Sequence, residues 1–208
     1  MGQLLDWDSS GLCPNTSKYE VHKGHMIAAR YGIGNAKRVK DTFTLTNVVP
    51  QERDFNSNRW MRAEGSLIQW AKNCQNIAPT ATIEARIYIV VGVIPTSFYG
   101  TSKTKFFGSA GFGNFQGDSK IFSGFGYRIL VPEIMWTAAC CMYTDNTVAG
   151  TYAFWRHNHP SIAQVIYHTN NQSAVTDMFN SIQTEITATV PGATFSRPNV
   201  FPNQPNCN

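Results

Sequence analysis

Cys140 and Cys141 are neighbours inside the apolar segment WTAACCM, and this pair restricts the fold more than any other feature of the sequence. Consecutive residues of an extended strand point to opposite faces, so the two thiols need different partners rather than one shared bond. The other cysteines are Cys13, Cys74 and Cys207, and none of the five has the CxxC spacing of a zinc site. We therefore expect disulfides, with one cysteine left over.

The expected disulfides bear on where the protein works. Disulfides persist in oxidising compartments, which favours an extracellular or secretory location. The first residues, MGQLLDWDSS, lack a basic segment followed by an apolar one, so no signal peptide is recognised in this chain. The longest apolar run, IYIVVGVIP from Ile87 to Pro95, is well short of the roughly 20 residues that cross a bilayer. We expect no membrane anchor.

Composition and length indicate one folded domain. The chain has 208 residues, of which 42% are hydrophobic and 14% charged, a balance that argues against disorder. No repeat, linker or charge block divides it, so we expect a single domain over residues 1–208. Within it we expect a loop over 1–18, an irregular Gly-, Phe- and Ser-rich excursion over 96–126, and a Pro- and Asn-rich tail over 191–208.

The segment from Thr42 to Val49 alternates strictly, which predicts a strand with Phe43, Asn47 and Val49 on one face. That face is apolar except for Asn47.

A helix is predicted after this strand and runs to about Cys74, with candidate N-caps at its beginning. The caps are Asp54, Asn56 and Ser57. At helical spacing one stripe contains Trp60, Glu64, Leu67, Ala71 and Cys74, with Arg62 on the opposite side. Glu64 is therefore a carboxylate in the middle of an apolar stripe.

Further elements follow from the same patterns. Glu84 to Pro95 is rich in Ile and Val and predicts a buried strand. Strands are also predicted over 127–131, 136–142 and 152–155, and an amphipathic helix over 173–187.

Three unusual residues fall within a short part of the chain: His25 beside a glycine, Asn47 on an apolar strand face, and Glu64 in an apolar helix stripe. Each alone is more often structural than functional. Together they suggest chemistry, because a buried carboxylate needs a cation. A neutral amide oxygen suits a hydrated divalent ion such as Mg²⁺, and an imidazole is readily neutral near pH 7 and can act as a base.

Positive charge is concentrated in the same part of the chain. Between Lys18 and Arg62 lie nine of the 17 Lys and Arg residues but only four acids, whereas the formal net charge of the whole chain is +4. Such a local excess of about +5 favours a polyanionic partner, although a solvated basic face would explain it equally well.

The segments KGHMIAA, TFTLTNVVPQ and FNSNRWMRAEG resemble the DNA/RNA non-specific endonuclease family, most strongly from Tyr19 to Cys74. The resemblance implies an α+β fold with a central, mostly antiparallel sheet and a ββα-metal nuclease motif. It also implies a Mg²⁺-dependent endonuclease that hydrolyses DNA and RNA to 5′-phosphate products. One ion is expected, with Mn²⁺ or Ca²⁺ as alternatives. The oligomeric state stays open.

The resemblance also implies roles for individual residues. His25 would be the general base, Asn47 the direct Mg²⁺ ligand, and Glu64 would hold water molecules bound to the ion. Asn56 would belong to the catalytic group. The residues expected to bind the substrate are Lys23, Arg30, Arg53 and Arg59.

Departures from the family pattern support a competing interpretation. His22 stands where the family has an acid, and Ile68 stands where it often has an arginine. Only about 20 residues precede the histidine motif, so the N-terminal strands of the family are expected to be missing. These departures would fit a catalytically impaired nuclease fold that binds nucleic acid or protein. A disulfide-rich structural protein would leave Asn47 and Glu64 unexplained.

His157 and His159, in the segment WRHNHP, raise a separate question of metal binding. Pro160 and the lack of a third ligand favour a surface loop over a metal site there.

Overall fold

The computed structural model describes residues 21–78, 80, 82–95, 132–158, 165–169, 173–189, 191–193, 195–202, 204 and 207. The chain forms two compact units, each built from several segments. The first unit contains Met1–Arg59, Val93–Ile134 and His157–Ala163, and the second contains Trp60–Gly92, Met135–Arg156 and Gln164–Asn208. The loop expected over 1–18, the excursion expected over 96–126 and the strand expected over 127–131 lie outside the described residues. The single domain over 1–208 stays a prediction.

The first unit contains a two-stranded antiparallel sheet of β1 (Val21–His25) and β2 (Val48–Glu52). Short helices connect these strands: η1 (Ala29–Gly32), α2 (Ala36–Asp41) and η2 (Leu45–Asn47). Asn35 caps α2, because its side-chain oxygen accepts the backbone N–H of Arg38 at 3.1 Å. This connection brings β2 back alongside β1 in the opposite direction.

The prediction of a strand from Thr42 to Val49 is wrong over most of its length, because the paired strand β2 begins only at Val48. Polar side chains bond locally instead. The Thr42 hydroxyl donates to the carbonyl of Val39 at 2.7 Å, and the hydroxyls of Thr44 and Thr46 lie 3.2 Å apart. Threonine and asparagine offer the backbone such local bonds in competition with a sheet ladder. The alternating pattern therefore reflects a tight connection and not an extended strand.

A continuous helical stretch follows β2 and begins with a π-helical segment, η3 (Phe55–Trp60), before α3 (Met61–Asn76). The predicted apolar stripe is confirmed: Trp60, Leu67 and Cys74 are buried, and Glu64 on the same stripe is half-buried. Arg62 is exposed, as expected for the opposite side.

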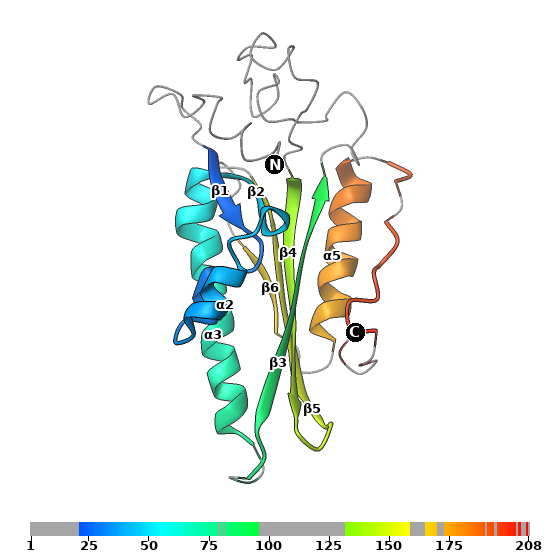
Figure 1. The fold of residues 1–208 in the computed structure, drawn as a ribbon. Helices are drawn as coiled ribbons and strands as arrows, with labels where there is room; N and C mark the ends of the chain where they lie inside the picture. The colour runs from blue at the N-terminus through cyan, green and yellow to red at the C-terminus, as the bar shows by residue number, and fades with distance from the viewer. Residues whose placement is uncertain are drawn as a thin grey trace. The chain divides into compact units, whose positions relative to one another are not determined.

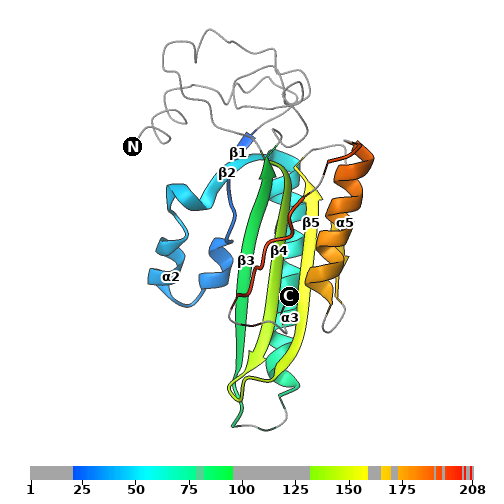
Figure 2. The same cartoon turned by 90° about the vertical axis from the view of Figure 1, so that its right-hand side faces the viewer.

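The second unit is built on a sheet with the strand order β3-β4-β5-β6. The strands are β3 (Ala85–Pro95), β4 (Pro132–Tyr143), β5 (Val148–His157) and β6 (Ile166–His168). The predicted C-terminal helix is confirmed as α5 (Ala174–Thr189). Helices α3 and α5 lie on opposite sides of the sheet (Figures 1 and 2). An α+β fold with antiparallel strands is thus confirmed.

The strands predicted over 136–142 and 152–155 form the centre of this sheet as parts of β4 and β5. A tight turn joins them. Asn146 adopts a positive φ of 68°, and the Asp145 carboxylate accepts the N–H of Thr147 at 2.9 Å. Because helices cover both faces, nearly every residue of the two strands is buried.

The prediction that Glu84 to Pro95 is a buried strand is only half right. The strand exists as β3, but it lies at an edge of the sheet, and Tyr88 is 40% exposed. An Ile- and Val-rich run is typical of a central strand, and sequence alone does not reveal which strand pairs on both sides. Packing explains the glycine at position 92, because a Cβ there would collide with the indole of Trp136.

The adjacent cysteines have different partners, as predicted. Cys141 pairs with Cys74 of α3, and Cys140 pairs with Cys207 in the C-terminal tail. The described part of the tail over 191–208 contains no α-helix or β-strand. One strand is therefore tied covalently on each of its faces.

Aromatic contacts fill both sides of the sheet in the second unit. Trp70 of α3 packs on Tyr152 with ring centroids 5.5 Å apart, and Trp136 packs on Phe179 of α5 at 5.1 Å. Aromatic pairs of this kind bury large areas and add favourable ring geometry. Among the described helices, none combines the length and apolar character that a membrane span requires.

Candidate active site

Pairing of β1 with β2 sets the position of His25, which lies opposite Val48 at the end of β1. The preceding Gly24 is required by its neighbour, because a Cβ there would collide with the side chain of Gln51. Gln51 crosses this space and its Nε2 donates to the His25 carbonyl at 3.1 Å. The glycine beside the histidine therefore has a structural cause, and Gln51 holds the backbone of the candidate base.

The His25 ring lies edge-to-face with Phe43, with ring centroids 4.6 Å apart and planes at 82°. Burial lowers the pKa of His25 from its ordinary value of 6.5, because a cation is poorly solvated there. Its Nε2 atom is enclosed and has no hydrogen-bond partner among the described residues, and the same is true of Gln51 Oε1. Unpaired buried polar atoms of this kind are uncommon and often mark functional positions.

Asn47 is buried, as the sequence predicted, and its side chain is bonded to the backbone on both sides. Its oxygen accepts the N–H of Ile27 at 2.8 Å, while its nitrogen donates to the carbonyls of Ile27 at 2.9 Å and Thr42 at 2.8 Å. Both amide hydrogens are therefore used, although the oxygen keeps a second lone pair. These bonds fix the chain just after His25 against the chain just before β2.

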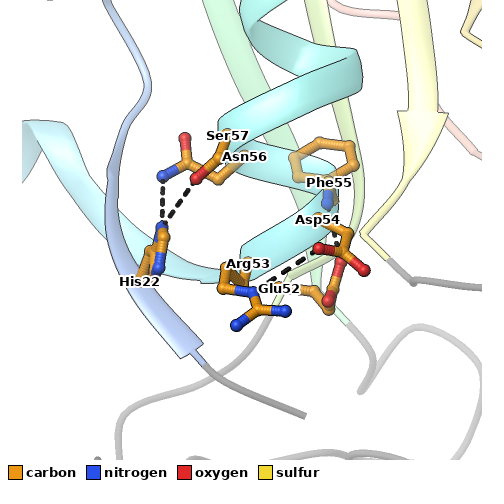
Figure 3. A network of polar contacts seen from close by, with 7 residues as sticks. All are labelled: His22, Glu52, Arg53, Asp54, Phe55, Asn56 and Ser57. Atoms are coloured by element: carbon orange, nitrogen blue, oxygen red, sulfur yellow. Dashed lines mark hydrogen bonds and ion pairs between the residues drawn. The ribbon is translucent and has the colours of Figure 1, made fainter.

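Asn56 and Ser57, predicted as candidate helix caps, bond to His22 instead (Figure 3). The Asn56 Nδ2 atom and the Ser57 Oγ atom each lie 3.2 Å from His22 Nδ1. An amide nitrogen only donates, so His22 Nδ1 is the acceptor of the contact with Asn56. The Asn56 oxygen is directed away from His22 (Figure 3).

The helical stretch is capped by Glu52, which the sequence did not identify. Its carboxylate accepts the N–H of Phe55 at 2.6 Å, and only 2% of Glu52 is exposed (Figure 3). A carboxylate here also meets the positive end of the helix dipole. Arg53 and Asp54, next along the chain, form an exposed ion pair at 3.5 Å, and such a pair contributes little to stability.

Asn158 is a second residue that the sequence did not single out. Its oxygen accepts the N–H of Glu52 at 2.8 Å, and its nitrogen donates to the carbonyls of Pro50 at 2.9 Å and Pro132 at 3.1 Å. The residue is 4% exposed. Asn158 thus fixes the backbone of β2, the strand that carries Gln51, from a position 106 residues away in the chain.

The other predicted site residues are distributed over several elements. Lys23 is exposed on β1, Arg30 is half-buried in η1, Arg53 is exposed, and Arg59 is half-buried in η3. Glu64 is half-buried on α3, in the second unit. The described contacts connect His25 with Gln51 and Phe43, and His22 with Asn56 and Ser57, so the site contains partners that sequence reasoning missed.

The expectation that His157 lies in a surface loop is wrong. His157 ends β5, is 9% exposed, and its Nδ1 lies 3.1 Å from the Glu133 carboxylate. Glu133 is 24 residues away in the sequence, so the segment around His157 alone could not reveal this contact. His159 lies outside the described residues.

The family model described as DNA/RNA non-specific endonuclease matches residues 4–190. No curated protein sequence gives a significant match.

Proposed function

Because the chain belongs to the DNA/RNA non-specific endonuclease family, we propose that it hydrolyses phosphodiester bonds of DNA and RNA, with Mg²⁺ as cofactor and His25 as general base. The observation that carries the proposal is the state of His25 within the matched region. Its lowered pKa favours a neutral ring at pH 7, and its Nε2 atom lacks a hydrogen-bond partner among the described residues. In the proposal, a water molecule that reaches the ring would transfer its proton to the unprotonated ring nitrogen of His25.

The metal ion would take an oxygen ligand from the protein, and two amides compete for this role. Asn47 was expected from the sequence, but both of its amide hydrogens and one oxygen lone pair already bond to the backbone. Asn56 is different, because its nitrogen bonds to His22 while its oxygen is directed away. The chemistry of Asn56 fits a hydrated Mg²⁺, Mn²⁺ or Ca²⁺ ion. We therefore assign the ion to Asn56 and keep Asn47 as the competing ligand.

Glu64 follows Asn56 by eight residues in one continuous helical stretch, a spacing of about two turns. In the proposal its carboxylate holds water molecules of the ion by hydrogen bonds. Mg²⁺, when bound, neutralises charge on the phosphate oxygens and assists departure of the 3′-oxygen, which leaves a 5′-phosphate.

Four basic residues are proposed to bind the sugar-phosphate backbone: Lys23, Arg30, Arg53 and Arg59. Lys23 and Arg53 are exposed and therefore accessible to a polyanion. Contacts to phosphate carry no direct sequence information, so cleavage with little base specificity is expected. The two disulfides further support an extracellular or secretory location.

The second candidate, a catalytically impaired binding protein, rests on His22 and Ile68. The contacts of His22 weaken it. Where the family has a carboxylate, His22 Nδ1 still accepts hydrogen bonds from Asn56 and Ser57. The Nδ1 atom of His22 can thus take the acceptor role of the missing acid, which supports activity.

The test compares cleavage by the wild type and His25→Ala. Supercoiled plasmid and single-stranded RNA are incubated with each protein, with Mg²⁺ or with EDTA. Ile33→Ala is the matched control, because Ile33 is 79% exposed and has no proposed role. We expect Mg²⁺-dependent cleavage by the wild type and Ile33→Ala only. If the wild type cleaves no faster than His25→Ala yet retards DNA on a gel, the binding protein is the correct interpretation.

The choice between the two amides has its own measurement. Mn²⁺ affinity, followed by electron paramagnetic resonance, is compared for Asn56→Ala and Asn47→Ala. We expect weaker binding in Asn56→Ala. A larger loss of affinity in Asn47→Ala, with unchanged thermal stability, would return the ligand role to Asn47.

A further inference from the structure

Phe43 is a large apolar side chain that is 65% exposed and lies directly on the candidate base. Its ring contacts the His25 ring edge-to-face at 4.6 Å. Single exposed apolar residues are common on proteins and need no functional reason. The position of Phe43 on His25 is what separates it from Ile33, which is more exposed at 79%.

The backbone around Phe43 is fixed on both sides. The Phe43 N–H donates to the carbonyl of Lys40 at 3.0 Å, and the carbonyl of the preceding Thr42 accepts from Asn47 Nδ2 at 2.8 Å. Thr42 N–H in turn donates to Val39 at 3.1 Å. Because the ring also packs against His25, it loses less conformational freedom when a ligand packs on it than a ring without such a contact would.

We propose that Phe43 is a stacking platform for an unpaired nucleobase next to the phosphate that is cleaved at His25. This inference rests on the proposed function, because it assumes a nucleic-acid substrate at this site. Aromatic side chains stack on bases of any identity, since every base has a π face. The bases of a duplex already stack on one another, so Phe43 gives the site a preference for single-stranded DNA or RNA.

Charge and space beside Phe43 suit the rest of such a substrate. The preceding helix, α2, exposes Lys37, Arg38 and Lys40. A cavity of about 350 Å³ lies next to this segment and is lined by Ile27, Arg38, Asp41, Thr42 and Asn47. That volume falls in the range of small-ligand sites. The cavity brings the guanidinium of Arg38, beside the carboxylate of Asp41, to the place where a neighbouring nucleotide would lie.

The test measures binding without cleavage. Single-stranded oligonucleotides that carry one abasic position, moved stepwise along the strand, are titrated in EDTA against the wild type, Phe43→Leu, Phe43→Trp and Ile33→Ala. For the wild type and Ile33→Ala we expect one abasic position to weaken binding about 5- to 100-fold. Phe43→Leu should lose this dependence, whereas Phe43→Trp should keep it. The tryptophan fluorescence that Phe43→Trp adds over the wild type should also be quenched when the oligonucleotide binds.

Two results would overturn the inference: no sensitive position in the wild type, or equal sensitivity in Phe43→Leu. If Phe43 only shields His25, Phe43→Leu will shift the pKa of His25 measured by NMR and leave the abasic profile unchanged. Failure of the proposed function appears differently, as absence of Mg²⁺-dependent cleavage in the plasmid and RNA assays. Because the abasic measurement needs no cleavage, the two failures are separable.

Discussion

The segments that carry the candidate site and the sheet of the second unit are held together by different forces. Around β1 and β2, buried amides and carboxylates bond to the backbone, as Asn47, Gln51, Glu52 and Asn158 do. In the second unit, apolar side chains fill both faces of the sheet and two disulfides tie β4. Hydrogen bonds are directional, whereas apolar burial is not. The segments around β1 and β2, which we call the polar segments, can therefore fix atoms for chemistry, while the sheet supplies stability.

Two histidines make the comparison concrete. His25 and His168 both have a pKa lowered mainly by burial, and both have an enclosed Nε2 atom without a partner among the described residues. His168 lies on β6 in the second unit. An unpaired ring nitrogen thus does not by itself define a catalytic site, and the surroundings of His25 are needed as well.

The largest expected effect is the difference in cleavage rate between alanine variants of these two histidines. We expect His25→Ala to lower kcat/KM for plasmid cleavage about 10²- to 10⁴-fold, because the proposed general base is lost. His168→Ala should leave kcat/KM within about twofold, because His168 has no role in the proposed reaction. Only the melting temperature should change. Equal losses of rate in both variants would show that the polar segments have no special catalytic role.

Breaking a disulfide tests the sheet. Cys141→Ser should lower the free energy of unfolding by about 2–5 kcal/mol, because the cross-link to Cys74 is lost. Urea unfolding at fixed pH measures the change. The double variant Cys74→Ser/Cys141→Ser is the control and should cost about the same as Cys141→Ser alone, since one bond is lost once. A clearly larger cost in the double variant than in Cys141→Ser would mean that the packing of the sulfur atoms matters more than the bond.

Asn158→Ala tests the polar segments. It removes three side-chain hydrogen bonds and leaves buried backbone groups at Glu52, Pro50 and Pro132 unpaired. We expect a loss of about 1–3 kcal/mol in unfolding free energy and a lower kcat, because β2 carries Gln51. Asn35→Ala is the matched control: it removes an exposed cap of α2 and should cost about 1 kcal/mol without a change in kcat. A fall in stability without a fall in kcat would separate Asn158 from the site.

The smallest effect concerns pH. The folded pKa of His25 lies below 6.5, so the neutral base persists to lower pH than in an unperturbed histidine. The acid limb of kcat/KM, measured at saturating Mg²⁺, should therefore have its midpoint below 6.5. An acid limb above 6.5 would show that a carboxylate, and not burial, dominates around His25.

The free energy of unfolding should also fall at acid pH. Below the folded pKa the buried rings of His25 and His168 must carry a charge that burial disfavours, so both destabilise the fold at acid pH. The free energy of unfolding should rise as pH increases toward 6.5 and then level off.

Sequence patterns predicted what depends on periodicity and missed what depends on distant partners. The stripe with Trp60 and Leu67 was correct, because helical spacing fixes which residues share a face. The two separate partners of Cys140 and Cys141 followed from strand geometry, but which partners they take did not.

Each error has an identifiable physical cause. At Thr42 and Asn47 side-chain bonds to nearby backbone replaced the expected strand. Glu52, and not Asn56, caps the helix, because the helical stretch already begins before Asn56. Asn158 bonds across 106 residues and leaves no signal in any local window.

The paired cysteines also determine what happens when the chain is cut. One disulfide joins Cys74 to Cys141 and the other joins Cys140 to Cys207, so the two enclosed loops overlap at the centre of β4. A single proteolytic cut anywhere between Cys74 and Cys207 therefore falls inside at least one closed loop, and the fragments stay covalently joined. A nicked molecule would keep its full mass on a gel until a reductant is added, which is a useful property in surroundings rich in proteases.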